Sequence, residues 1–168
     1  MNVKETKFFE LLSYSVGGNP LPDGFCCNEE EIKYFYELAL KHDIASIVAY
    51  ALEKNGLYLQ DEYSLKFKDE MLFAAGRVTL LDCFYNEVTA VLGQEKIDYI
   101  SLKGSVIRKL YPQDYFRTSS DIDILVKKRD FERACSALKE KLNLKEVGRS
   151  QHDQSLSRSP FETVEVNF

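Results

Sequence analysis

The chain has 168 residues, of which 45% are hydrophobic and 12% aromatic, and its formal net charge at pH 7 is −5. This composition predicts a soluble globular protein with a sizeable core and excludes disordered chains, collagen-like fibres and coiled-coil fibres. Proteins that bind nucleic acid non-specifically are usually basic, so the acidic balance argues against nucleic acid as a partner.

The charge is distributed unevenly along the chain. Residues 1–93 carry 8 basic and 15 acidic residues, whereas residues 94–168 carry 14 and 12, so an anionic ligand is better sought in the second half. The four cysteines form no CxxC pair, and only two histidines accompany them, which argues against a structural zinc site. The charged start lacks a signal-peptide pattern, and no apolar run approaches the roughly 20 residues of a membrane span. We therefore expect a cytoplasmic protein without a membrane partner.

The first half of the chain shows the hydrophobic spacing of helices. Asn28 followed three residues later by Glu31 is a variant of the capping box that starts a helix. The expected helices are Val3–Tyr14, a segment that starts at Asn28, Ile44–Lys54 and a long stretch from Asp61 to about Leu92. These elements predict a helical N-terminal lobe over residues 1–93.

The second half changes to short β-branched runs between helices. Four strands are expected at about residues 97–102, 122–126, 144–147 and 163–168, with helices at 105–110 and 129–142. Residues 149–160 are polar and are expected to be irregular. The order predicts an α+β protein in which residues 94–168 form a small mixed sheet with helices.

The strongest local signal is Asp121-Ile122-Asp123-Ile124-Leu125-Val126. Side chains alternate between the faces of a strand, so Asp121 and Asp123 project together, about 6–7 Å apart at Cα. Two carboxylates held there repel each other unless a cation lies between them, and Mg²⁺ prefers such oxygen ligands. The alternative is an exposed strand face that happens to carry two aspartates.

Two weaker signals flank this strand. Lys103-Gly104-Ser105 lies at a strand-to-helix turn, where backbone N–H groups favour an anion and Gly104 leaves room for a phosphate. Taken alone, this signal is weak, because most Gly-Ser turns are only turns. In the last expected strand, Glu165 and Asn167 share one face, and a position beside the aspartate strand would bring Glu165 towards Asp121 and Asp123. Three converging carboxylates could hold two divalent ions for phosphoryl transfer, whereas simple β-amphipathicity is the alternative.

The order of these elements resembles the DNA polymerase beta-like nucleotidyltransferase superfamily. The closest resemblance is to its uncharacterised bacterial branch, which shows an L-K-G turn and then an Arg four residues before D-[IV]-D-[IL]-L-V. The corresponding residues here are Leu102-Lys103-Gly104, Arg117 and Asp121 to Val126, and the resemblance covers roughly residues 30–168.

This resemblance implies a metal-dependent enzyme that transfers a nucleoside monophosphate from a nucleoside triphosphate, expected to be ATP, to an acceptor hydroxyl. It implies that Asp121, Asp123 and Glu165 are the catalytic carboxylates and ligate Mg²⁺ or Mn²⁺, as two ions. Glu165 would also align or deprotonate the acceptor hydroxyl, and the nucleotide phosphates would meet Lys103, Gly104, Ser105 and Arg117. The acceptor, a small molecule or a protein, and the oligomeric state are left open.

The chain departs from the family pattern in three places. The segment from Ser105 to Asp121 is longer than in many members of the superfamily, although the bacterial branch tolerates this length. Asn167 stands where the branch often has His, and the chain ends at Phe168 where relatives continue. A truncated or short member is therefore expected. Two alternatives stay open, namely an inactive member that binds nucleotide or a protein partner, and a nucleotide-sugar glycosyltransferase that uses the D-x-D pair.

Overall fold

The computed structural model describes residues 2–168, which divide into two compact units. The first contains the chain up to Ala75 and Tyr111–Phe116; the second contains Gly76–Leu110 and Arg117–Phe168. The division at Gly76 differs from the expected regions 1–93 and 94–168. It falls inside one long helix, α4, because the residues of α4 after Gly76 pack with the sheet of the second unit.

The first unit is helical, as its periodicity predicted. Its elements are α1 (Val3–Gly17), α2 (Glu29–Lys41), α3 (Ala45–Lys54), the first part of α4 (Glu62–Gln94) and a 3-10 turn, Asp114–Phe116. Fully buried Leu11, Ile32, Phe35, Leu52 and Phe67 lie at the centre of its hydrophobic core. The expected capping box at Asn28 and Glu31 is present.

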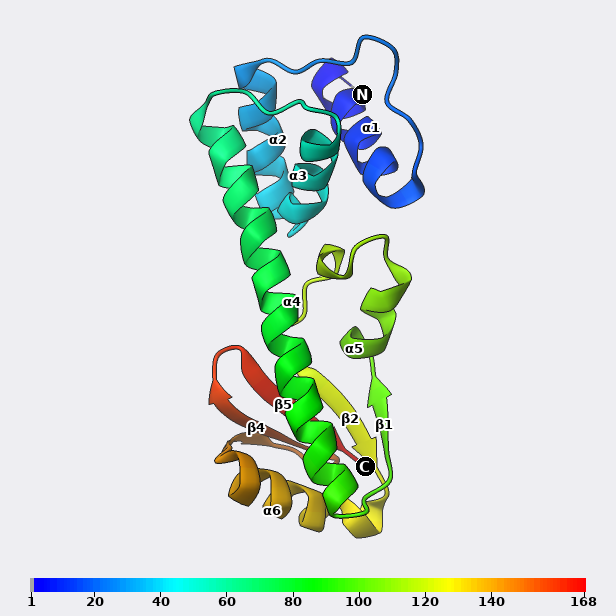
Figure 1. Cartoon of the computed structure of the whole chain (residues 1–168), viewed down its shortest axis with the longest axis vertical. Coiled ribbons are helices and arrows are strands. Elements are labelled where there is room, and N and C mark those ends of the chain that lie inside the picture. The colour runs from blue at the N-terminus through cyan, green and yellow to red at the C-terminus, as the bar shows by residue number, and fades with distance from the viewer. Residues whose placement is uncertain (1) are drawn as a thin grey trace. The chain divides into compact units, whose positions relative to one another are not determined.

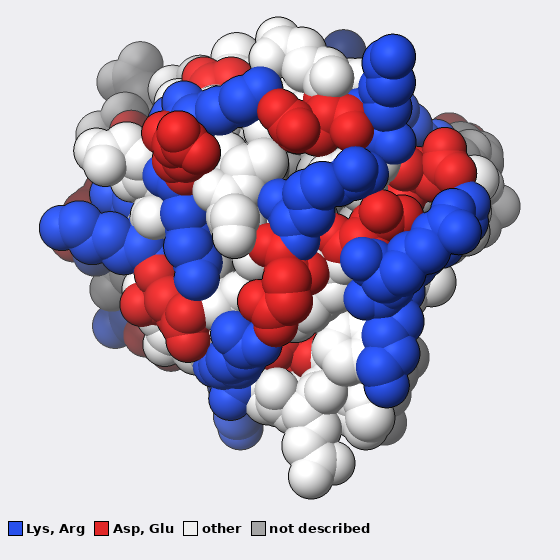
Figure 2. Space-filling view, turned by 90° about the horizontal axis from the view of Figure 1, so that it is seen from below, with Lys and Arg blue, Asp and Glu red and all other residues white. Residues whose placement is uncertain are grey.

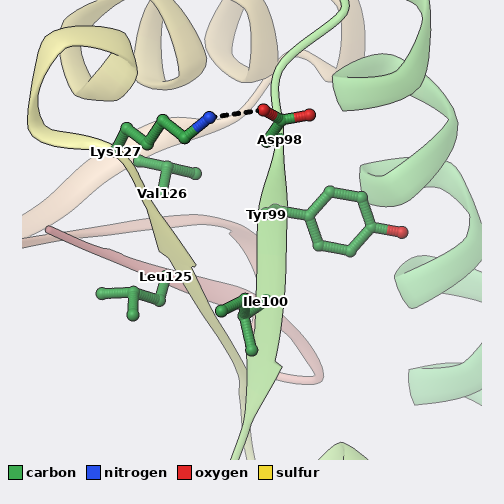
Figure 3. A pocket seen from close by; sticks show the side chains of 6 residues that line it. All are labelled: Asp98, Tyr99, Ile100, Leu125, Val126 and Lys127. Atoms are coloured by element: carbon green, nitrogen blue, oxygen red, sulfur yellow. Dashed lines mark hydrogen bonds and ion pairs between the residues drawn. The ribbon is translucent and has the colours of Figure 1, made fainter.

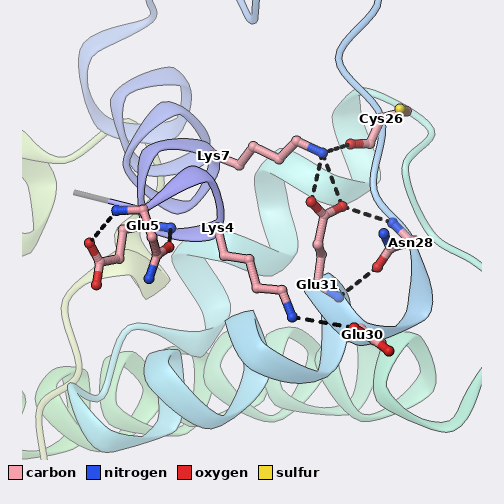
Figure 4. A network of polar contacts seen from close by, with 8 residues as sticks. Lys4, Glu5, Lys7, Cys26, Asn28, Glu30 and Glu31 are labelled. Atoms are coloured by element: carbon pink, nitrogen blue, oxygen red, sulfur yellow. Dashed lines mark hydrogen bonds and ion pairs between the residues drawn. The ribbon is translucent and has the colours of Figure 1, made fainter.

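A polar network fastens α1 to the start of α2 (Figure 4). The Lys7 ammonium donates to both carboxylate oxygens of Glu31, at 2.8 and 3.0 Å, and to the Cys26 carbonyl. Glu31 is only 6% exposed and also accepts from the Asn28 backbone N–H. Burial alone would raise the pKa of Glu31, but these hydrogen bonds outweigh it and hold the pKa below its ordinary value. The Glu31 carboxylate is therefore a charged anchor of this unit.

The second unit is built on a five-stranded mixed sheet of order β1-β2-β5-β4-β3. Only β2 and β5 run parallel; the other neighbours are antiparallel. Its elements are β1 (Tyr99–Leu102), α5 (Gly104–Ile107), β2 (Ile122–Val126), α6 (Phe131–Leu142), β3 (Lys145–Arg149), β4 (Asp153–Ser159), β5 (Glu162–Asn167) and 3-10 turns at Arg108–Leu110 and Lys128–Asp130. This architecture confirms the expected α+β fold.

One face of the sheet carries the core of this unit. The second part of α4 lies across the sheet and α6 packs beside it (Figure 1). Between helices and sheet lie Phe84, Val88, Leu92, Ile122, Ile124, Leu138, Leu156, Val164 and Val166, all at most 2% exposed. Because side chains alternate along each strand, the residues between these apolar positions face the other side of the sheet.

The sequence interpretation missed one strand. Residues 149–160 were expected to be irregular, but they contain β4, which pairs with β3 on one side and β5 on the other. Its only fully buried apolar side chain is Leu156, and the other fully buried position is taken by Gln154. The apolar alternation that marks a strand in the sequence is therefore too weak in β4, and pairing with its neighbours holds it in place.

Candidate active site

The two strands that carry the predicted carboxylates are neighbours. β2 and β5 pair in parallel with Asp123 opposite Glu165, and Asp121 lies just before β2. Carboxylate oxygens of Asp121, Asp123 and Glu165 all lie within 4.8 Å of one another. Parallel strands are only about 4.8 Å apart, so two side chains in register on one face must meet. The predicted convergence of the three acidic groups is thus present in the structure.

The same alternation that builds the core directs these carboxylates away from it. Ile122 and Ile124 flank Asp123 in β2 and are 2% and 0% exposed on the helix side of the sheet. In β5, Val164 and Val166 flank Glu165 and are both fully buried. Strand alternation therefore leaves Asp123 and Glu165 on the face opposite α4 and α6.

The environment of Asp121 disfavours its negative charge. Burial raises the pKa of Asp121, and the neighbouring Asp123 charge raises it further, while Lys103 acts in the opposite direction. The position of this residue is fixed through its backbone, because the Ser119 hydroxyl donates to the Asp121 carbonyl at 3.1 Å. Arg77 in turn donates to the Ser119 carbonyl at 2.9 Å. Sequence reasoning did not identify Ser119 or Arg77, since neither belongs to a recognisable motif.

Lys103 is the basic group that the structure joins to the carboxylates. Its ammonium lies 2.9 Å from Asp123 Oδ1, although the two residues are 20 positions apart in the chain. The hydrogen bond to Asp123 and its charge raise the pKa of Lys103. Asp123 is only 4% exposed, whereas the Lys103 side chain is 62% exposed. The buried carboxylate is thus paired with a cation that reaches it from solvent.

The glycine-serine turn is more tightly packed than the sequence suggested. Gly104 and Ser105 are both buried, and the Ser105 hydroxyl donates to the Leu102 carbonyl at 3.2 Å. A Cβ atom on Gly104 would lie 2.6 Å from Ser119 Oγ, so the space that a side chain would need is already filled by Ser119. This packing explains why position 104 has no side chain. The helix that follows, α5, is only four residues long.

Arg117 is the fourth predicted phosphate contact. It is half-buried, and its Nε is buried without a hydrogen-bond partner within residues 2–168. Asn167 donates its amide to the Ile124 and Glu165 carbonyls, each at 3.3 Å, and so ties β5 to β2 beside the carboxylates.

A cavity of about 190 Å³ lies further along β1 and β2. Figure 3 shows its lining, with Ile100 and Leu125 from paired strands and an ion pair of 2.6 Å between Lys127 and Asp98 at its rim. None of the predicted site residues lines it. The carboxylate cluster, and not this apolar hollow, is therefore the candidate active site.

Comparison with known proteins agrees with this fold. A family model described as an uncharacterised nucleotidyltransferase matches residues 28–168, and the chain therefore belongs to this family. Membership supports a general nucleotidyltransferase role. No curated protein and no solved structure matches the chain significantly. Within residues 2–168, no helix combines the length and apolar character that crossing a membrane requires.

Proposed function

We propose that the chain is a metal-dependent nucleotidyltransferase that moves a nucleoside monophosphate from a nucleoside triphosphate, expected to be ATP, to an acceptor hydroxyl and releases pyrophosphate. The pairing of Asp123 with Glu165 on parallel strands, with Asp121 beside them, is the observation that carries this proposal. Membership of a nucleotidyltransferase family supports the same class of chemistry.

The three carboxylates suit Mg²⁺ or Mn²⁺ as the cofactor, and two ions are expected. All three are hard oxygen donors from one face of the sheet, and such cations share carboxylate ligands with substrate phosphates. Bound there, the ions would neutralise the charge that develops on the transferred phosphoryl group. The charge of Asp121, which burial and Asp123 disfavour, would be stabilised by such a cation.

The reaction requires the acceptor oxygen to bond to the α-phosphorus while the bond from that phosphorus to the pyrophosphate oxygen breaks. Glu165 is only half-buried, so an acceptor can reach it, and we propose that it accepts the proton released by the acceptor hydroxyl. Lys103 and Arg117 are the proposed side-chain contacts of the triphosphate. Gly104 and Ser105 are buried, so any contact they make with phosphate would use backbone N–H groups.

Calorimetry with Mn²⁺ and a non-hydrolysable ATP analogue tests the proposed metal site. Two aspartates of the second unit provide a test variant and a matched control. Asp123→Asn removes a predicted ligand, whereas Asp98→Asn removes an exposed carboxylate that also pairs with a lysine. We expect Asp123→Asn to weaken binding at least about tenfold and Asp98→Asn to leave it unchanged. Equal heats for wild type and Asp123→Asn would contradict the proposal. Release of pyrophosphate with pools of candidate acceptors then tests turnover.

An inactive member that only binds nucleotide is the second candidate. The ion pair of Lys103 with Asp123 and the covered Gly104 favour it, because the ion pair occupies a predicted metal ligand and Ser119 fills the space beside Gly104. It predicts binding by calorimetry without pyrophosphate release for any acceptor. The alternative of a nucleotide-sugar glycosyltransferase gains no support from the family match. Measured hydrolysis of UDP-sugars by the protein would support it.

For the acceptor, we favour a small molecule or a protein over nucleic acid. On the face shown in Figure 2, basic and acidic side chains alternate. Many of the basic groups in the second unit are neutralised locally, as in the pairs of Arg149 with Glu132 and Lys141 with Glu95. A polyanion is normally bound by a continuous basic surface.

A further inference from the structure

Lys103 has an unusual backbone conformation for a residue with a side chain. Its φ is 44° and its ψ is −117°, in a region that glycine normally occupies. Its carbonyl accepts hydrogen bonds from the backbone N–H groups of Val106 and Ile107, at 3.2 and 2.9 Å, which fix the turn into α5. Such a conformation is costly and persists only where the surroundings enforce it. Lysine at this position therefore requires an explanation beyond the turn itself.

The charges around its ammonium supply that explanation. Lys103 Nζ lies 2.9 Å from Asp123 Oδ1, and oxygens of Asp121 and Glu165 lie within 4.8 Å of those of Asp123. Both of these neighbouring carboxylates also attract the ammonium. One cation in contact with a cluster of three carboxylates reduces their mutual repulsion without cancelling it. The ammonium thus does part of what a divalent cation would do in the same place.

We infer that Lys103 is the built-in counter-ion of the metal-free site, which a divalent cation must displace from Asp123 and which then becomes free to contact the triphosphate. This inference rests on the proposed function, since it requires a metal at the carboxylates. Asp123 Oδ1 cannot serve the ammonium and a metal ion equally well. The Lys103 side chain is 62% exposed on a flexible stem, so its ammonium can leave the site without unfolding the turn.

The inference predicts effects of opposite sign for metal and for nucleotide. Without nucleotide, Lys103 competes with the metal, so removing its ammonium should tighten metal binding. With a triphosphate present, the ammonium contributes to binding the phosphates, so the same change should weaken nucleotide binding. A lysine that is only a structural salt bridge would affect stability and would not produce this reversal.

The test measures free Mn²⁺ by electron paramagnetic resonance, with and without a non-hydrolysable ATP analogue, for wild type, Lys103→Met and Lys127→Met. Lys127 is the matched control because it also pairs with an aspartate, at 2.6 Å, and lies about 13 Å along the strand beyond Asp123. Both substitutions change the net charge equally. We expect Lys103→Met to bind Mn²⁺ alone about three- to tenfold more tightly than Lys127→Met, and the metal–nucleotide complex at least about threefold more weakly.

Lys103→Gly is a second variant that removes the ammonium and suits the positive φ, so relief of the backbone strain offsets part of the lost ion pair, and it should give the same two shifts. The inference is wrong if Lys103→Met and Lys103→Gly bind Mn²⁺ no more tightly than Lys127→Met does. It is also wrong if these two variants bind the metal–nucleotide complex as tightly as Lys127→Met does. In both cases the proposed metal site is unaffected. If wild type and all variants fail to bind Mn²⁺, the proposed function fails with it.

Discussion

Replacing Gly104 by alanine tests whether this glycine is required by the packing of the site or by a bound phosphate. The added Cβ atom would lie 2.6 Å from Ser119 Oγ and 3.3 Å from Ser119 Cβ. Atoms do not approach so closely without a shift, so the Ser119 hydroxyl must rotate away or its segment must move. Either change breaks the 3.1 Å hydrogen bond to the Asp121 carbonyl and disturbs a predicted metal ligand.

The expected cost follows from these contacts. Overpacking costs typically about 1–3 kcal/mol, and the hydrogen bond contributes about 1 kcal/mol of this. Gly104 has no positive φ, so alanine is strain-free in the backbone and offsets up to about 1 kcal/mol. We expect Gly104→Ala to lower the free energy of unfolding by about 1–2 kcal/mol. Ser119→Gly should cost a similar amount, through the lost hydrogen bond and a more flexible backbone.

The double variant separates the two explanations. Without the Ser119 side chain, the added Cβ of Gly104→Ala meets no close neighbour, so the double variant should be no less stable than Ser119→Gly alone. Urea unfolding of all four proteins, followed by circular dichroism, measures the coupling, expected at about 1–2 kcal/mol. Additive costs would refute the packing argument. A nearly neutral Gly104→Ala that loses nucleotide binding in both backgrounds would instead assign the glycine to phosphate.

Two further substitutions, one in each unit, test how a carboxylate charge affects stability. Glu31→Gln should lower the free energy of unfolding at pH 7 by about 1–2 kcal/mol. The folded state lowers the pKa of Glu31, so the stability difference between wild type and Glu31→Gln is present above the ordinary pKa of 4.5 and is lost as pH falls below it. Urea unfolding at pH 7 and at pH 3 measures this loss. Glu30→Gln, at an exposed carboxylate, is the control. Asp121→Asn should raise the melting temperature in EDTA at pH 7, because the folded state raises the pKa of Asp121 and its charge opposes folding. That gain should vanish below about pH 3.8, where the carboxyl is protonated in both states; a lower melting temperature at pH 7 would contradict the sign of this effect.

Local patterns in the sequence were sufficient for the elements that build the site. The helix that starts after Asn28 follows from its capping box, and β2 and β5 follow from apolar residues at every second position. The placement of Asp123 and Glu165 on one face follows from the same alternation. These features depend on residues a few positions apart, which is the range over which sequence periodicity is informative.

Features that depend on distant contacts could not be read in this way. The ion pair of Lys103 with Asp123, the packing of Ser119 on Gly104 and the pairing of β4 each join residues that no local pattern links. The division at Gly76 was also missed, because the spacing of apolar residues in the sequence, with Ala74, Val78 and Leu81, continues across it. What a long amphipathic helix packs against is decided by tertiary structure and not by its own sequence.

The register between β2 and β5 connects the core to the chemistry. If β5 slipped by one residue, Val164 or Val166 would lie beside Asp123, and Glu165 would turn towards the core between the sheet and the helices. Burying an unpaired carboxylate there costs several kcal/mol, whereas the observed register buries both valines completely. Hydrophobic burial therefore opposes a one-residue slip and keeps Glu165 on the same face of the sheet as Asp123. The repulsion between these carboxylates is imposed by the core, which is why the site needs a cation, whether Lys103 or a metal ion.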